Sequence, residues 1–150
     1  MKLSPAAELA VRGALVLADR YGKGLTPLEA VCLERQLPRD YLAKIFASLA
    51  RARLVRPVRG KRGGYELARD PARISLLEVI EAVEGPLALN LCQQDPPACD
   101  RIDCGVRSVW SELQDLIRRK LGSTSLTDCL RRGRNPASAG ELSPALPKLA

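Results

Sequence analysis

The chain of 150 residues contains no histidine and only one Phe, one Trp and three Tyr. Histidine is the side chain that most often transfers protons near neutral pH, and the sequence also has no serine–histidine–aspartate set and no phosphate-binding loop. The scarcity of aromatic residues argues against a β-sandwich core and favours a core of Leu, Val and Ala on helices. We therefore expect a mainly α-helical protein that is not an enzyme.

The sequence also lacks an apolar run of about 18 residues, so no segment is typical of a transmembrane helix. Residues 1–18 carry a charge followed by an apolar stretch, but Glu8 and Arg12 interrupt that stretch and no small-residue cleavage site follows it. This segment therefore indicates a folded helix rather than an export signal. We expect a cytoplasmic protein without a membrane partner.

The net charge of +7 comes from one part of the chain. Residues 35–73 hold 11 Lys and Arg against three acids, a surplus of 8, so the remainder sums to −1. Such a local surplus favours nucleic acid as the partner over a membrane, because no amphipathic basic helix with bulky aromatics accompanies it. A solvated basic surface that serves only solubility remains the alternative.

A helix-turn-helix followed by a hairpin is predicted in the first half of the chain. Ser4-Pro5 opens a first helix, the capping box Thr26–Glu29 opens a second that ends near Gln36, and apolar residues recur on one face of a third between Tyr41 and Leu49. Two β-prone segments then flank a glycine-rich turn over residues 59–64. We expect a winged helix-turn-helix domain over residues 1–85.

The second half is predicted to contain a loop and a long helix. A capping box at Ser75–Glu78 opens a helix that ends at Gly85, and Pro96-Pro97 excludes regular helix from residues 86–105. Residues 106–132 hold a long helix with an apolar stripe and a short closing helix, and residues 133–150 are typical of a disordered tail. The stripe favours antiparallel or crossed pairing with a second copy, and packing within its own chain is the alternative.

These segments together resemble the Rrf2 family of winged-helix transcription regulators, the group that includes IscR, NsrR and CymR. The resemblance rests on residues 1–18, 40–55, 58–67 and 74–86 and on three cysteines ahead of a long helix, and it covers roughly residues 1–132. It implies a mainly α fold with a small β-hairpin, and a homodimer formed through the long dimerisation helix. It also implies that the protein is a repressor that binds palindromic promoter DNA.

Cys92, Cys99 and Cys104 are the candidate ligands of an iron–sulfur cluster. Thiolates are soft ligands that suit iron–sulfur clusters or zinc, but a closed zinc site needs four protein ligands and the chain has no histidine. Many members of the family hold a cluster on these cysteines, whereas others lack the cysteines and sense different ligands. IscR-like relatives add a histidine where this chain has Arg107. The resemblance to NsrR implies instead Glu8 of the other subunit as the fourth ligand, and favours a 4Fe–4S over a 2Fe–2S cluster.

Three other interpretations of the thiols remain open. Cys92, Cys99 and Cys104 are also compatible with disulfide-based redox sensing without metal. A structural zinc would take its fourth ligand from one of four carboxylates, namely Asp95, Asp100, Asp103 or Glu8. An iron–sulfur electron carrier would leave the wing and the charge surplus unexplained. Cys32 and Cys129 occupy helical positions and are interpreted as small apolar residues.

The resemblance also implies how DNA is bound: the third helix enters the major groove and the hairpin tip reaches the minor groove. The candidate contacts on the helix are Arg39, Asp40, Tyr41 and Lys44, although Tyr41 could equally pack inward. At the hairpin tip, Arg59 is the candidate for the minor groove, and Lys61 and Arg62 are candidates for phosphates. Nitric oxide, redox poise and iron supply all remain open as the signal.

Overall fold

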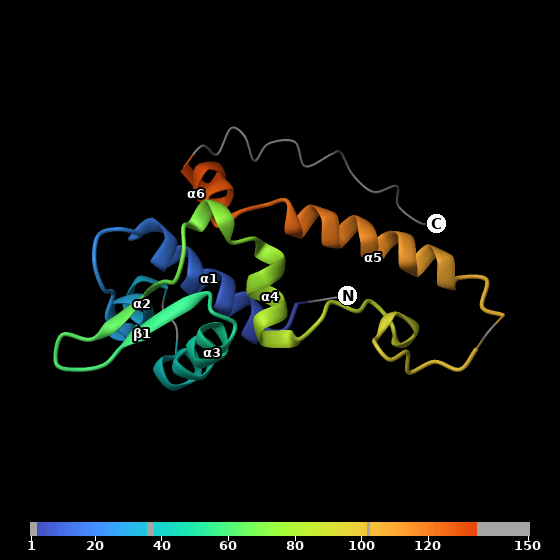
Figure 1. Cartoon of the computed structure of the whole chain (residues 1–150), viewed down its shortest axis with the longest axis horizontal. Coiled ribbons are helices and arrows are strands. Elements are labelled where there is room, and N and C mark those ends of the chain that lie inside the picture. Colours follow the sequence, from blue (N-terminus) through green and yellow to red (C-terminus); the bar gives the residue numbers. More distant parts are fainter. Residues whose placement is uncertain (1–2, 36–37, 102, 135–150) are drawn as a thin grey trace, which may run out of the picture.

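The structure is a computed structural model that describes residues 3–35, 38–101 and 103–134. The elements run in the order α1 (Pro5–Asp19), α2 (Leu28–Arg35), α3 (Arg39–Arg51), β1 (Val55–Val58), β2 (Gly64–Leu67), η1 (Pro71–Arg73), α4 (Leu76–Glu84), η2 (Leu91–Gln93), α5 (Arg107–Gly122) and α6 (Leu126–Arg134). Figure 1 shows two regions: a head made of α1–α4, the β1–β2 hairpin and α6, and an arm made of residues 86–122. The predicted mainly α fold with a small hairpin is confirmed.

The core of the head lies around α1, which begins where the sequence predicts. Ser4 caps the helix, since its hydroxyl accepts a hydrogen bond from Ala7 N at 3.2 Å, and Pro5 occupies the first helical position. Gly13 faces α3, and a Cβ there would lie 2.6 Å from Cε1 of Phe46. The close packing of α1 on α3 therefore depends on this glycine.

The third helix and the hairpin form the predicted winged helix-turn-helix. Leu42, Ile45, Phe46 and Leu49 are buried on one face of α3, because apolar residues recur there at helical spacing. Strands β1 and β2 pair antiparallel with Val55 opposite Leu67 and Val58 opposite Gly64. The ring of Tyr65 meets the ring of Phe46 edge-on at a centroid distance of 4.9 Å, so the hairpin is fixed to α3 through the core.

Thr26, just before α2, forms an isolated antiparallel β-bridge with Tyr65 of this hairpin. Thr26 N donates to Tyr65 O at 2.9 Å, and Tyr65 N donates to Thr26 O at 2.8 Å. Gly64 permits this approach, because a Cβ on it would lie 2.7 Å from Thr26 O. The base of the wing is therefore held to the start of α2.

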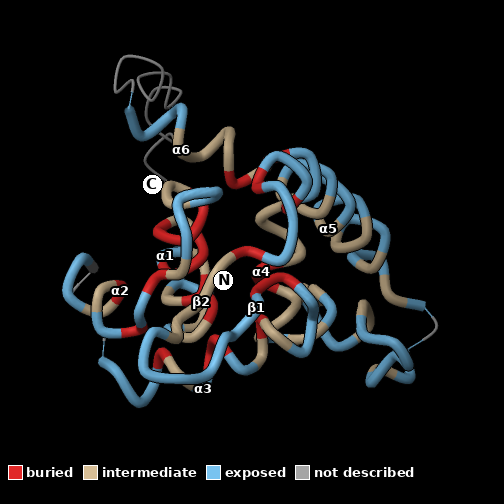
Figure 2. The backbone as a smooth tube through the Cα atoms, turned by 60° about the vertical axis from the view of Figure 1, so that its left-hand side comes forward, coloured by how far each residue is buried: buried red, intermediate tan, exposed pale blue. Residues whose placement is uncertain are grey.

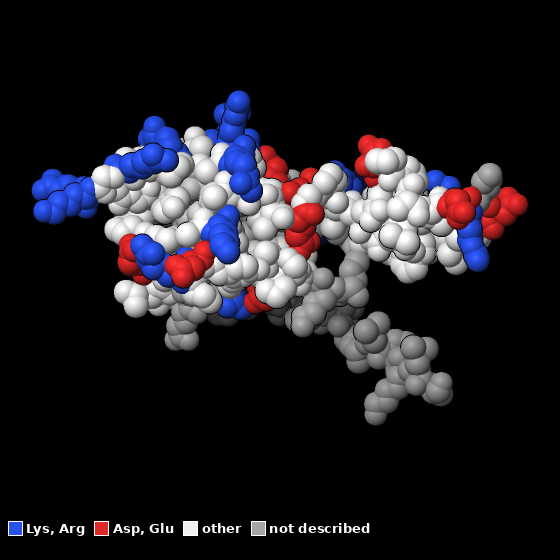
Figure 3. Space-filling view, turned by 90° about the horizontal axis from the view of Figure 1, so that it is seen from below, with Lys and Arg blue, Asp and Glu red and all other residues white. Residues whose placement is uncertain are grey.

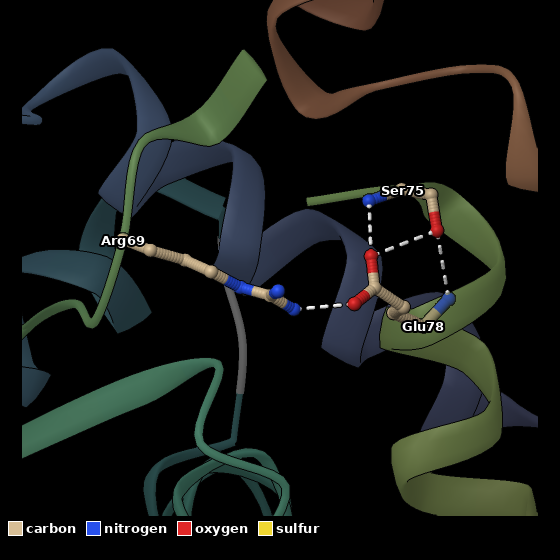
Figure 4. A network of polar contacts seen from close by, with 3 residues as sticks. All are labelled: Arg69, Ser75 and Glu78. Carbon is tan, nitrogen blue, oxygen red and sulfur yellow. Dashed lines mark hydrogen bonds and ion pairs between the residues drawn. The ribbon is translucent and has the colours of Figure 1, made fainter. Parts of the chain in front are cut away.

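A polar network fixes the start of α4 to the segment that leaves the hairpin (Figure 4). The predicted capping box is present: Glu78 N donates to Ser75 Oγ at 3.2 Å, and Ser75 N donates to Glu78 Oε2 at 2.8 Å. Arg69 donates to the other carboxylate oxygen of Glu78. Burial raises the pKa of Glu78, but the hydrogen bonds from Ser75 and Arg69 outweigh it and hold the pKa below the ordinary value.

The arm has no comparable core. None of the residues of α5 is buried, and Figure 2 shows buried residues in the head and none along α5.

Helix α6 returns to pack on α1 and ends at Arg134, so residues 133 and 134 are helical rather than part of the predicted disordered tail. The rest of that predicted tail, residues 135–150, lies outside the described residues. No described helix is long and apolar enough to cross a membrane.

Candidate nucleic-acid interface and cysteine loop

The face of α3 opposite the core presents the predicted DNA-contacting residues to solvent. Arg39, Asp40, Tyr41 and Lys44 are all exposed, at the first two turns of the helix. Tyr41 therefore lies at the surface, and the alternative that it packs inward is wrong. Side chains at the start of a helix are well placed to reach base edges when that end enters a groove.

One of these residues, Arg39, already has a partner. Its Nε donates to Glu29 Oε1 of α2 at 2.9 Å, and its Nη1 lies 3.9 Å from Asp40 Oδ1. A backbone hydrogen bond lowers the pKa of Glu29, and the hydrogen bond from Arg39 lowers it further, so this carboxyl is ionised near neutral pH. The sequence did not predict this pair, because Glu29 and Arg39 are ten positions apart on two helices.

The tip of the hairpin presents a second group of cations. Arg59, Lys61 and Arg62 are exposed and form no ion pair within the described part of the chain. Gly60 has φ of +117°, a conformation that L side chains rarely adopt, and Gly63 N donates to Gly60 O at 2.9 Å to close the turn. Figure 3 shows Lys and Arg side chains gathered over the head and extending to the wing tip.

A shallow groove separates the wing from the start of α3. Its volume is about 300 Å³, and it is lined by Glu29, Arg39, Arg59, Gly60 and Gly63 among others. One candidate contact from each group therefore borders this groove, Arg39 from α3 and Arg59 from the wing.

The three thiols lie in the segment between α4 and α5, as the sequence predicts, with Cys92 in the short helix η2 and Cys99 and Cys104 in irregular backbone. Cys92, Cys99 and Cys104 are all half-buried and free of disulfide bonds. The loop is attached to α5 through polar contacts, since Ser111 Oγ donates to Gln93 Oε1 at 3.2 Å and Leu89 N donates to Gln114 Oε1 at 3.0 Å. Cys92 Sγ also accepts a hydrogen bond from Gln93 Nε2 at 3.5 Å.

These thiols fit an iron–sulfur group in their chemistry, because three free, soft donors share one loop with little regular backbone. Within the residues 3–35, 38–101 and 103–134, however, no three Cys, Asp or Glu side chains lie close enough together to hold a metal. Glu8 is exposed on the first turn of α1 and accepts from Arg12 of the same helix. One chain alone therefore does not bring Glu8 and the three thiols together.

Cys32 and Cys129 differ from the loop thiols. Cys32 packs against the core of the head, and burial raises the pKa of its thiol. Burial likewise raises the pKa of Cys129 in α6. A raised pKa lowers the thiolate fraction at neutral pH, which agrees with their interpretation as apolar residues, although both are half-buried rather than fully buried.

Two polar contacts join the arm to the head, and the sequence analysis missed them. Arg118 Nη1 of α5 donates to Glu81 Oε1 of α4 at 2.8 Å, and Leu87 N donates to the same oxygen at 2.9 Å. Because Glu78 and Glu81 both belong to α4, this helix contacts the exit of the wing through Arg69 and the arm through Arg118. The sequence places Glu78 and Glu81 one turn apart on α4, but it does not show that their partners are Arg69 and Arg118.

A helix-turn-helix, a basic hairpin after it and an exposed basic face define a winged-helix protein of the class that regulates transcription. A family model described as "Rrf2: Iron-dependent Transcriptional regulator" matches residues 3–132, and the chain belongs to this Rrf2 family.

The sequence is similar to two named regulators. It is 30% identical over 129 residues to the HTH-type transcriptional regulator CymR of Bacillus subtilis, covering 85% of this chain and 88% of that protein. It is 32% identical over 131 residues to the HTH-type transcriptional regulator IscR of Xenorhabdus nematophila, covering 87% and 80%.

Solved structures agree with this likeness. The structure of CymR, the global cysteine regulator of B. subtilis, matches with a TM-score of 0.74 and 28% identity over 86% of this chain and 95% of that one. The structure of T. potens IscR matches with a TM-score of 0.72 and 31% identity over 97% and 93%.

Proposed function

We propose that the protein is a homodimeric repressor that binds palindromic promoter DNA, and that its DNA binding changes with the state of an iron–sulfur cluster. The observation that carries the proposal is a set of three free, half-buried thiols on one irregular loop, in a chain whose head is a winged helix. The similarity to IscR and the family's description as iron-dependent support it.

In this proposal α3 enters the major groove and the wing tip enters the adjacent minor groove. Arg59 is the residue for the minor groove, because arginine suits a narrow and strongly negative groove, and Lys61 and Arg62 contact phosphates. Arg59→Ala should weaken operator binding by about 1–3 kcal/mol, the scale of one lost base-reading contact. Arg132→Ala, which removes an exposed arginine from α6, is the matched control and should leave the affinity unchanged.

The dimer forms through α5, whose outer face is apolar and uncovered. The exposed fractions on this face are 53% for Val106, 49% for Val109, 40% for Leu113 and 55% for Leu116. These positions are three or four residues apart and so form one seam along the helix. A second copy of the same seam would remove these side chains from water.

The cluster would be held by Cys92, Cys99 and Cys104 with Glu8 of the partner subunit, as a 4Fe–4S rather than a 2Fe–2S cluster. When bound, the cluster supplies iron that reacts with nitric oxide or responds to redox poise or iron supply. Glu8 would leave Arg12 to serve as ligand, and a carboxylate oxygen binds such iron less tightly than a fourth thiolate. Glu8 would then be the weakest of the four ligands, and its loss would free α1 of one subunit from the arm of the other.

A second candidate is regulation by the thiols alone. It is favoured by the absence, among the described residues, of a convergent set of metal ligands, and by the similarity to a regulator described as the global cysteine regulator. In this case two of the three thiols Cys92, Cys99 and Cys104 would be oxidised to a disulfide by exchange with an external disulfide, which is reduced to two thiols, and the reverse exchange would restore them.

Protein purified without oxygen separates the two candidates. The cluster proposal expects a brown protein with iron and inorganic sulfide, which loses its colour and changes its DNA affinity in a gel shift when Cys99 is replaced by Ala. Cys129→Ala, which removes a half-buried thiol outside the loop, should stay brown and bind normally. DNA binding by material that contains neither iron nor sulfide would support the thiol candidate, and a Cys99→Ala protein that stays brown would contradict the assigned ligand.

A further inference from the structure

The groove between the wing and α3 contains an acidic side chain among basic ones. Glu29 contributes a carboxylate from α2, while Arg39 and Arg59 contribute guanidinium groups from α3 and the wing. Both Glu29 and Arg39 are exposed, and Nε of Arg39 lies 2.9 Å from Oε1 of Glu29. The carboxylate therefore faces the open groove rather than the core.

The sugar–phosphate backbone of bound DNA would have to cross this groove, an argument that rests on the proposed function. When a helix occupies the major groove and a hairpin occupies the adjacent minor groove, one strand of phosphates separates the two grooves and passes between helix and hairpin. In this protein, the space between the start of α3 and the wing is the groove that Glu29 borders.

A carboxylate in this place opposes phosphate binding. The lowered pKa of Glu29, caused by the backbone hydrogen bond and by Arg39, keeps it negatively charged at neutral pH. Because Glu29 and Arg39 carry opposite charges at hydrogen-bond distance, the pair is close to neutral as seen by a phosphate. Arg39 therefore adds little to the sequence-independent attraction between the protein and DNA phosphates, although it is one of the candidate DNA contacts.

We propose that Glu29 is a specificity-determining residue that suppresses binding to DNA of arbitrary sequence. It neutralises Arg39 beside the path of the phosphates, so tight binding must come from base contacts and from the unpaired cations of the wing tip. Phosphate contacts supply essentially all of the binding to random DNA but only a share of the binding to an operator, so the proposal requires that the operator complex, held by base contacts, depends less on phosphate attraction at this groove.

The experiment compares Glu29→Gln with Glu34→Gln. Gln at position 29 keeps an oxygen that can accept from Arg39 but removes the charge; Glu34 lies on the same helix, accepts from Arg20 at 2.8 Å and does not line the groove. The probes are a random-sequence duplex and the tightest duplex that wild-type protein selects from a random library. Affinities are measured over a range of salt concentrations.

Glu29→Gln should bind the random duplex severalfold tighter at low salt, with a slope of log K against log salt that is steeper by about one. Its ratio of selected to random affinity should fall, while Glu34→Gln keeps the wild-type slope and ratio. Equal changes in the two variants, or an unchanged slope in Glu29→Gln, would overturn the proposal.

Substitution of Arg39 tests the role of Glu29 a second time. Arg39→Ala leaves Glu29 unneutralised and should weaken random-duplex binding, and Glu29→Gln in the Arg39→Ala background should restore it to about the wild-type level. Failure of that rescue in a folded double variant also contradicts the role of Glu29. If wild-type protein selects no duplex at all, the proposed function itself fails, which is a distinct outcome.

Discussion

The head and the arm are built from helices of similar length but are stabilised in different ways. In the head, α1 and α3 bury whole apolar faces against each other, with Leu17, Leu42 and Phe46 at most 1% exposed. In the arm, α5 buries no residue; it packs beside α4, where Glu81 accepts hydrogen bonds from Arg118 and Leu87 N. The head has the contacts of an independent folding unit, whereas the arm has an apolar face that the described residues leave exposed.

The difference shows that, within the described residues, the head has a closed apolar core, whereas α5 has an exposed apolar face and no core of its own. It also provides a probe, because Trp110 is the only tryptophan of the chain and lies on α5. Its fluorescence reports on the arm, while far-ultraviolet circular dichroism reports largely on the helices of the head.

The largest expected effect is a loss of stability of the head. Phe46→Ala removes a fully buried ring that contacts Tyr65 and fills the space over Gly13, and it should lower the free energy of unfolding by about 3–5 kcal/mol. Urea unfolding followed by circular dichroism measures this. Tyr41→Ala, on the exposed face of the same helix, should change the free energy by no more than about 0.5 kcal/mol. Similar losses in the two variants would mean that the head is not the stable region.

Substitution on the seam of the arm should affect assembly rather than folding. Leu116→Ala should weaken the proposed dimer by about 2–4 kcal/mol, since the lost side chain occurs twice in a symmetric pair. Sedimentation equilibrium measures the dissociation constant, and the free energy of unfolding of the head should stay unchanged. Asp115→Ala, one position away and off the seam, is the control. A Leu116→Ala protein that dimerises like wild type would place the interface elsewhere.

A smaller effect is expected at the joint between the two regions. Glu81→Ala removes the acceptor for Arg118 Nη1 and Leu87 N and should loosen the arm by about 1 kcal/mol, because the ion pair is partly screened by solvent. Hydrogen exchange of α5 amides, together with Trp110 emission, should show the change while the amides of the head keep their protection. The control is Glu84→Ala, three residues further along α4. It removes the carboxylate that accepts a hydrogen bond from Ser4 N within the head. Equal loosening of α5 in both variants would contradict a specific joint.

The smallest expected effect is a pH dependence of the free energy of unfolding of the head. The pKa of Glu78 in the folded protein is below its ordinary value of 4.5, so its ionised form stabilises the fold. This contribution is complete above about pH 4.5 and is lost as the pH falls through the folded-state pKa. The difference in unfolding free energy between wild type and Glu78→Gln should be constant from pH 5 to about pH 8 and shrink below pH 4.5. In a Ser75→Ala background the difference should be smaller at every pH.

Local patterns predicted most of the elements because local interactions form them. The Ser75–Glu78 capping box, Pro5 at the start of α1 and the apolar spacing of α3 each act within one turn or two, and the structure has all of them. The sequence places the end of α6 two residues too early, because the composition from Gly133 onward is typical of a disordered tail.

The contacts that link elements could not be predicted in the same way. The pair of Glu29 and Arg39, and the bridge between Thr26 and Tyr65, depend on how α2 sits against α3 and the wing. Thr26 was predicted only as the cap of a helix, but its backbone also forms an isolated β-bridge with Tyr65 of the hairpin. The three thiols were placed correctly on a loop, and the identity of what they bind stays a prediction, since sulfur ligands alone suit several groups.

The bridge at the base of the wing separates a fixed part of the hairpin from a replaceable one. Gly64 is held against Thr26, whereas residues 59–62 beyond it are exposed. Under the proposed function, the sequence of the turn can therefore be varied to alter the DNA preference without removing a buried side chain, provided that Gly63 and Gly64 are retained.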